Sequence, residues 1–269
     1  MSGNIHKTAP PHAGSTAYIN ARIVDPTGDS DYRGAVLISD GKIADYGPNL
    51  FASGAPYGIE SIDCRGLVLA PGLVDTRVHT GEPGEEHKET LESAGAAAAV
   101  GGITSLVLLP DNEPPFDDAS LIEFVARRAR LIKLVNMYAY GALTVGLEGK
   151  ELAEIGLLAE AGAVAFTDAD HAVGSAQVMR RALYYCKAFD ALIVHLPQEP
   201  TLSGGHMTSG EMATRLGLSG NPPLAEVMMV ERDIRLVEMT GGRLHLAKIS
   251  TAESVAVIAA AKARGLKLT

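Results

Sequence analysis

The segment PGLVDTRVHTGEPG, residues 71–84, decides the fold of this chain and frames the question of its function. Its apolar run predicts a strand over 73–79 that ends in a loop rich in Gly and Pro. Because residues i and i+2 of a strand point to the same side, Arg77 and His79 share one face. A His-x-His pair here would give a metal ion two imidazole ligands, but a guanidinium has no free lone pair and stays protonated. The strand therefore carries one half of a metal-binding pair.

From residue 71 onward the chain alternates short apolar runs with helical stretches, which is typical of βα units that build a parallel sheet. We expect strands over 73–79, 104–110, 133–141, 162–168, 191–196 and 243–249, with a further one that starts at Gly265. The clearest helices are LESAGAAAAVG (91–101) and SVAVIAAAKARG (254–265), which are rich in Ala and closed by Gly. The pattern predicts an α/β fold, an incomplete TIM-like (β/α)8 barrel with about six to seven βα units.

Eight strands are needed to close such a barrel, and an open one leaves two hydrophobic parallel edges in water. We therefore expect residues 71–269 to form a barrel that is truncated before its last strand or strands. The alternative is a partner that covers the open edge.

The residues before this barrel have a different composition. Residues 1–15 are polar and rich in Pro, Gly and Ser, so we expect a flexible tail. Residues 16–70 hold short β-rich runs separated by Gly, Asp and Pro, with a hairpin signal at Asp40 and Gly41. They predict the N-terminal part of a small β-sandwich domain.

Charge and hydropathy exclude several classes of partner. The chain of 269 residues has 23 basic and 32 acidic residues and a net charge of −9, which favours neither nucleic acid nor an anionic membrane. No stretch approaches the ~18 apolar residues of a membrane span, and the N-terminus lacks the pattern of a secretion signal. Cys64 and Cys186 have no CxxC spacing, so we expect two reduced core cysteines in a soluble, cytoplasmic protein.

Six motifs occur in the same order as in a known family. Residues 71–84 resemble the PGLIDxHVHxREPG signature of the dihydroorotases, which are (β/α)8 barrels of the amidohydrolase superfamily. Later family motifs are resembled by GGITSLVLLPDNEPPFDD (101–118), GAVAFTDAD (162–170), LIVHLPQEP (192–200), HMTSGEMATRLGLSGNPPLAE (206–226) and RLHLAKISTAESV (243–255). One motif alone is weak evidence, but six in order identify the chain as a member of this family. In the family, strands from the far C-terminus complete the β-sandwich.

The resemblance implies two metal ions at the C-terminal mouth of the barrel, held by four histidines, a bridging carboxylate and an aspartate from the eighth strand. Three positions of this chain match: His79 from the first strand, Asp168 after the fourth, and His195 at the end of the fifth. Two positions have changed, because Arg77 and Lys248 stand where the family has histidines.

The eighth-strand aspartate, which the family uses as general acid and base, lies beyond Thr269. His245 survives from the sixth-strand motif, but it is three positions from Lys248 and so points to the opposite face of the strand. We therefore expect His245 to have a packing or hydrogen-bonding role. His87 and His171 lie in loops, where we expect them to face solvent.

Positions that bind substrate in the resembled family have changed as well. Gly81 replaces the arginine that forks onto the substrate carboxylate. Asp111 replaces an asparagine, and its charge would repel an anionic substrate. The residues Glu82, Pro83 and Gly84 are retained, and we expect them to shape the loop after the first strand.

Loss of the metal ions would leave the buried carboxylate of Asp168 uncompensated, which is unfavourable. We expect the cationic groups of Arg77 and Lys248 to replace the metals in an ion-paired cluster around Asp168, with no tightly bound cofactor. The alternative is one zinc ion on His79, Asp168 and His195, which the neighbouring Arg77 charge opposes.

These expectations favour a dihydroorotase-like protein of de novo pyrimidine biosynthesis that is not catalytic. The resemblance implies a structural or regulatory partnership with aspartate carbamoyltransferase in a homo- or hetero-oligomer. An active dihydroorotase with a reduced metal site is the alternative, in which Asp168 and His195 would activate water by general-base action. A hydantoinase-like or allantoinase-like hydrolase is a further alternative.

Overall fold

The computed structural model describes residues 14–55 and 57–269. The chain divides into two compact units, of which one ends at Gly72 and the other begins at Leu73. Most of the tail predicted at 1–15 lies outside the described residues. In the described part of the chain, no helix is long and apolar enough to cross a membrane.

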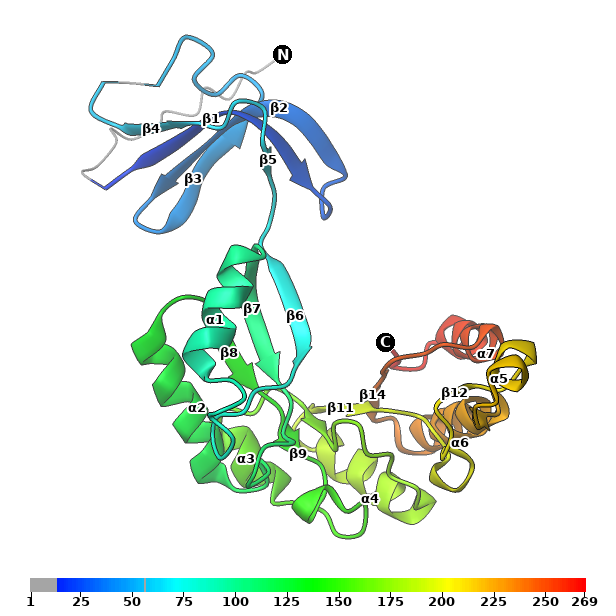
Figure 1. Cartoon of the computed structure of the whole chain (residues 1–269). Coiled ribbons are helices and arrows are strands. Elements are labelled where there is room, and N and C mark those ends of the chain that lie inside the picture. Colours follow the sequence, from blue (N-terminus) through cyan, green and yellow to red (C-terminus); the bar gives the residue numbers. More distant parts are fainter. Residues whose placement is uncertain (1–13, 56) are drawn as a thin grey trace. The chain divides into compact units, whose positions relative to one another are not determined.

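The first unit is a β domain made of one five-stranded sheet (Figure 1), with the order β3-β2-β1-β4 and with β5 also paired to β1. The strands are β1 (Thr16–Asp25), β2 (Ser30–Ser39), β3 (Lys42–Gly47), β4 (Glu60–Asp63) and β5 (Val68–Leu69). Asp40 and Gly41 join β2 to β3 with positive φ angles of 51° and 71°, as a two-residue hairpin turn requires. The described residues of this unit do not form the second sheet of the predicted sandwich.

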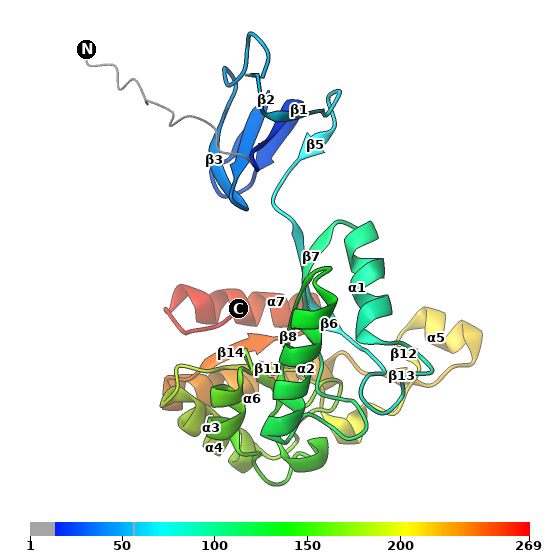
Figure 2. The ribbon, with the colours of Figure 1, turned by 90° about the vertical axis from the view of Figure 1, so that its left-hand side faces the viewer.

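The second unit is a parallel α/β structure whose strands follow one another in chain order (Figures 1 and 2). Its main strands are β6 (Leu73–Val78), β7 (Ile103–Leu108), β8 (Asn136–Ala139), β9 (Gly141–Ala142), β10 (Phe166–Thr167), β11 (Leu192–His195) and β14 (Arg243–Leu246). They form two sheets, β6-β7-β8 and β9-β10-β11-β14, and only Tyr140 separates β8 from β9. The α/β class predicted from the sequence is confirmed.

Helices connect these strands and cover one side of them. They are α1 (Leu91–Val100), α2 (Ala119–Ile132), α3 (Ile155–Ala161), α4 (Ala176–Lys187), α6 (Leu224–Thr240) and α7 (Ala252–Ala263). A separate excursion between β11 and α6 carries β12 (Met207–Thr208), α5 (Glu211–Leu216) and β13 (Gly220–Asn221), and two short 3-10 turns span Val145–Leu147 and Pro200–Leu202. Both helices that the sequence predicts most clearly are confirmed as α1 and α7.

Two apolar clusters lie on the two faces of the strands. The larger one packs strand residues such as Leu108 and Ile193 against helix residues such as Leu183 and Val237. The smaller one holds seven buried residues on the other face of the strands, away from these helices: Val107, Leu109, Tyr140, Ala165, Ala169, Val194 and Ala247. Both cysteines are free, and burial raises the pKa of the Cys186 thiol to about 12.

The expected strand boundaries needed correction at two places. The strand predicted at 133–141 starts only at Asn136, because α2 continues to Ile132 and Lys133 caps it in the left-handed region, at φ 55°. The strand predicted at 162–168 is reduced to the two residues of β10, because Gly162 still caps α3. The strand expected from Gly265 begins to form, since Leu268 pairs in parallel with Leu244 of β14.

The loop after β6 is held by the residues that the sequence singles out as structural. Glu82 is 6% exposed and accepts hydrogen bonds from the Leu91 amide (2.8 Å) at the start of α1 and from Nε of Arg128 (2.7 Å) on α2. Gly84 has φ 102°, and a Cβ there would lie 1.7 Å from the carbonyl oxygen of Glu113. The loops after β6 and β7 therefore meet at a point that only glycine fits.

Replacing Glu82 with Ala should destabilise the fold by about 2–3 kcal/mol, because a buried helix amide and the Arg128 guanidinium lose their acceptor. Urea denaturation measures the change. Arg127→Ala is the matched control, since Arg127 is exposed one position from Arg128 on the same helix and should change stability by no more than about 0.5 kcal/mol. Equal stability of Glu82→Ala and the wild type would contradict the anchoring role.

Candidate functional site

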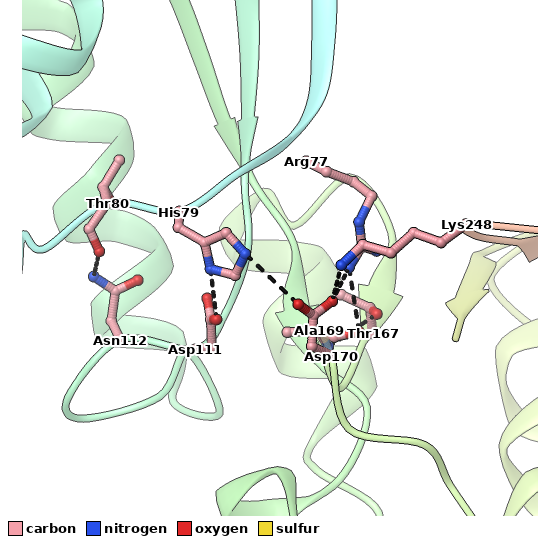
Figure 3. Close-up of polar contacts among 9 residues, drawn as sticks. All are labelled: Arg77, His79, Thr80, Asp111, Asn112, Thr167, Ala169, Asp170 and Lys248. Carbon is pink, nitrogen blue, oxygen red and sulfur yellow. Dashed lines mark hydrogen bonds and ion pairs between the residues drawn. The ribbon is translucent and has the colours of Figure 1, made fainter. Parts of the chain in front are cut away.

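Two cationic side chains converge on one carboxylate at the mouth of the second unit (Figure 3). Arg77, on β6, places Nη2 2.6 Å from Oδ1 of Asp170, and the Lys248 ammonium lies 2.6 Å from the same oxygen. Nη2 of Arg77 also donates to the carbonyl of Ala169, at 3.4 Å. Arg77 is 17% exposed, whereas Asp170 and Lys248 are 45% and 46% exposed. The arrangement is a half-buried ion-pair cluster, which we call the Arg77–Asp170–Lys248 cluster.

Backbone conformation brings the three charges together. Ala169 and Lys248 both adopt left-handed φ angles, 54° and 56°, which non-glycine residues rarely do and which cost about 1 kcal/mol or more each. The turn at Ala169 directs the next side chain, Asp170, toward β6 and β14. Burial alone would raise the pKa of Asp170, but the hydrogen bond and charge of Lys248, with the charges of Arg77 and His79, hold that pKa below its ordinary value.

His79 lies between two carboxylates on the same side of the site. Its Nδ1 is 2.7 Å from Oδ2 of Asp111, and its Nε2 is 4.0 Å from Oδ2 of Asp170 (Figure 3). Both Arg77 and His79 therefore face Asp170, as their alternation on β6 predicts. The change to Asp111 has given His79 a carboxylate partner within the protein.

The expectation that the cations gather around Asp168 is wrong. The carboxylate of Asp168 is 3% exposed and accepts from the amides of Leu143 (3.0 Å) and Thr144 (2.9 Å) and from the Thr144 hydroxyl. Because β10 ends at Thr167 and the chain turns at Ala169, Asp168 points back to the segment after β9. Burial raises the pKa of Asp168, and the hydrogen bonds from Thr144 and Leu143 counter only part of that rise.

His195 is enclosed in a buried hydrogen-bond network. Its Nδ1 lies 2.6 Å from Oδ2 of Asp233, and its Nε2 accepts from the amide of Val173 at 3.0 Å. The amide can only donate, so Nε2 is unprotonated and Nδ1 carries the hydrogen that Asp233 accepts. Arg232 closes the network, with two nitrogens on Oδ1 of Asp233 and Nη1 on the carbonyl of Val173. Both ring nitrogens of His195 are thus used within the fold.

The three predicted ligands are not brought together as a metal site. His79 bonds to Asp111, Asp168 to the segment after β9, and His195 to Asp233 and Val173. Across residues 14–55 and 57–269, no group of three or more His, Cys, Asp or Glu side chains is placed to hold a metal ion. Asp168 and His195 do not fit the metal centre that the family resemblance implies, because their hydrogen bonds hold them inside the fold, whereas Nε2 of His79 has only the 4.0 Å contact with Asp170.

The structure also places the remaining histidines and the altered substrate positions. His245 bonds through Nδ1 to the Thr269 hydroxyl at 2.9 Å, which confirms a hydrogen-bonding role, and burial together with the charge of Arg77 lowers the pKa of His245. His87 and His171 are exposed, as expected. A Cβ at Gly81 would lie 2.1 Å from the carbonyl oxygen of Glu85, so the backbone has closed around the glycine.

Sequence reasoning missed three residues that organise the site. The family motif points to Asp168 and not to Asp170, although the spacing Asp-Ala-Asp supplies a second carboxylate. Asp233 lies in the middle of α6, 38 residues from His195, and no local pattern connects them. Asn112 ties the loop after β7 to the loop after β6 by donating to the carbonyl of Thr80 at 2.9 Å.

The fold matches that of solved hydantoinase and dihydropyrimidinase structures. Over 94% of this chain and 57% of theirs, it superposes on the L-hydantoinase (dihydropyrimidinase) from Arthrobacter aurescens with a TM-score of 0.74 at 22% identity. The dihydropyrimidinase from Brevibacillus agri gives a TM-score of 0.72 at 21% identity, over 94% of this chain and 56% of that one. At these identities the likeness shows the fold alone: an α/β unit with an N-terminal β domain.

Sequence comparison defines the family. A family model described as dihydro-orotase-like matches residues 66–254. The chain is 42% identical over 251 residues to the dihydroorotase of Syntrophotalea carbinolica and 43% identical over 251 residues to that of Syntrophobacter fumaroxidans. These matches cover 93% of this chain but 58% and 57% of the relatives, so the chain spans a little over half of their length. The chain belongs to the dihydroorotase family.

Replacing Asp168 with Ala should lower stability by about 2–4 kcal/mol, because two buried amides and a hydroxyl lose their acceptor. Asp168→Asn should cost only about 1 kcal/mol, since its amide oxygen still accepts from the two backbone groups. Chemical denaturation of both variants measures the difference. If Asn is as damaging as Ala, the negative charge rather than the hydrogen bonding of Asp168 is what the fold requires.

Replacing Asp233 with Ala should destabilise the protein by about 3–5 kcal/mol, because His195 and Arg232 lose a fully buried partner. Glu231→Ala, on the exposed side of the same helix, is the control and should be nearly neutral. Thermal unfolding compares the two. A stable Asp233→Ala variant would contradict the structural role of the buried Asp233 carboxylate.

Proposed function

We propose that this protein is a non-catalytic member of the dihydroorotase family that serves de novo pyrimidine synthesis as a structural or regulatory partner of aspartate carbamoyltransferase in the cytoplasm. The observation that carries the proposal is the Arg77–Asp170–Lys248 cluster. At two positions where the family resemblance places metal-binding histidines, this chain has cations that pair with its own carboxylate.

The same geometry weighs against metal-free catalysis. A general base needs a free lone pair directed at water, and the Asp168 oxygens and both His195 nitrogens are already hydrogen-bonded inside the fold. General-base action alone supplies about 10²- to 10⁴-fold acceleration, far less than enzymes of this kind need. The alternative of an active dihydroorotase would require both groups to leave their partners.

Gly81, at the position where the resembled family has its substrate-binding arginine, supports the proposal independently. Gly81 donates its amide to the carbonyl of Glu89 at 3.1 Å, and the Glu85 amide donates to its carbonyl at 2.6 Å. Any side chain at Gly81 would collide with the Glu85 carbonyl. The loop therefore leaves no space for the arginine side chain that, in the resembled family, binds the substrate carboxylate.

Outside the altered positions, residues of the family motifs keep the hydrogen bonds that hold the loops. Glu226, in the GNPPLAE motif, accepts from the backbone amides and hydroxyls of Ser250 and Thr251, at 2.7–3.0 Å. Glu82 likewise keeps its two partners. A protein that acts as a structural subunit needs an intact fold but no metal chemistry. Retained scaffold contacts together with a changed site are what the proposed partnership requires.

The full-length protein should show no ring closure of carbamoyl aspartate and no ring opening of dihydroorotate above background, whereas ordinary enzymes turn over at about 1–10³ s⁻¹. The assay is run with and without added zinc. His79→Gln is the control, because His79 is 54% exposed and its loss should spare the fold while removing any turnover at this mouth. Turnover at an enzymatic rate that His79→Gln abolishes would establish the active alternative.

Purified full-length protein and the aspartate carbamoyltransferase of the same organism should form a complex when mixed. Sedimentation velocity at several ratios measures its stoichiometry and Kd, with each protein alone as the reference. Two independent species at concentrations of tens of micromolar would refute the partnership, whatever the activity assay shows.

A further inference from the structure

We infer that the Arg77–Asp170–Lys248 cluster is a protein-built substitute for a metal centre, which joins the strand ends at the mouth and keeps divalent cations out. The inference deepens the proposed function, since both start from cations at former ligand positions. It makes a separate claim, however: the fold neither needs nor admits a metal ion here.

The cluster connects elements that no backbone pairing joins. Arg77 belongs to β6, at the free edge of one sheet, and Lys248 follows β14, in the other sheet. Asp170 follows β10 and receives both cations on one oxygen. A single carboxylate thus links the first and last named strands of the barrel-like unit, as a metal ion with ligands from both sides would.

The charge of the cluster opposes a divalent ion. Asp170 is already paired with two cations, and the neighbouring carboxylate of Asp111 is paired with His79, so neither carboxylate is free to attract a metal. A cation entering the mouth would have to displace Arg77 or Lys248 from their partner.

Asp170 is the member on which the cluster depends. Nε and Nη1 of Arg77 are buried and have no hydrogen-bond partner among the described residues, so Asp170 and the Ala169 carbonyl carry its polar contacts. Without the carboxylate, two cations would face each other with no neutralising charge. Loss of Asp170 should therefore cost more stability than loss of an exposed ion-pair carboxylate.

The first experiment measures the melting temperature of the full-length protein with EDTA and with added zinc chloride, and its zinc content after dialysis. We expect substoichiometric zinc and the same Tm in both conditions. Asp170→Asn should lower Tm by about 3–6 °C, again without dependence on metal. The matched control is Asp190→Asn, whose carboxylate pairs with Arg243 but is 78% exposed, and it should change Tm by no more than about 1 °C.

The second experiment restores imidazoles at the two altered positions. Zinc affinity of the double variant R77H/K248H, measured by competition with a chromophoric chelator, should exceed that of the wild type by at least about tenfold, because ligands replace repelling charges. The single variant K248H should give a smaller gain, which keeps the test valid if the double variant folds poorly. An affinity equal to that of the wild type in both variants would show that the cations are not what excludes metal.

The inference is overturned if the wild type retains one zinc ion per chain whose removal lowers Tm, or if Asp170→Asn melts like the wild type. Its failure is distinct from failure of the proposed function. Bound zinc without turnover would overturn the substitute centre and leave the non-catalytic role standing. Turnover without zinc would overturn the non-catalytic role and leave the substitute centre standing.

Discussion

The carboxylate of Asp170 is the constraint around which the mouth of this protein is organised. One of its oxygens accepts hydrogen bonds from two cations, and its position depends on a left-handed turn at Ala169. Ion pairs with this exposure contribute little when they are isolated, but here Arg77 is mostly buried, and its other acceptor among the described residues is the Ala169 carbonyl at 3.4 Å. The Arg77–Asp170–Lys248 cluster therefore contributes to the stability of the fold.

The segment from Asp168 to Gly174 is fixed at several further points. Asp168 binds the chain after β9, Val173 donates to His195, and Arg232 holds the carbonyls of Val173 and Gly174 at 2.9 Å. Each anchor uses a different element, so the segment cannot shift at one point without straining the others. This cooperation explains how a buried histidine and a buried carboxylate at family ligand positions remain satisfied by hydrogen bonds alone.

The sequence predicts much of this fold, and its failures have identifiable causes. Alternation of apolar runs locates the parallel strands and the two Ala-rich helices, because that periodicity is a local property. The family resemblance, and not periodicity, implies that Arg77 and Lys248 stand at altered ligand positions. The sequence does not identify Asp170 as their partner, because the direction of that side chain depends on a positive φ at Ala169. An alanine in the sequence gives no indication of a positive φ. The pairing of His195 with Asp233 is likewise a tertiary contact with no local signal.

The two kinds of residue in this chain respond differently to substitution. Glu82 and Glu226 each satisfy several backbone or side-chain donors, so their loss would expose buried polar groups in loops that position whole helices. A metal ligand, in contrast, makes a contact whose loss can be compensated locally if another charge fills the space. In the proposed substitute centre, Arg77 on β6 and Lys248 after β14 supply that charge. On this proposal, a few substitutions at the site remove the chemistry while the distributed hydrogen bonds of the loops keep the fold, and resemblance in scaffold motifs alone does not establish activity.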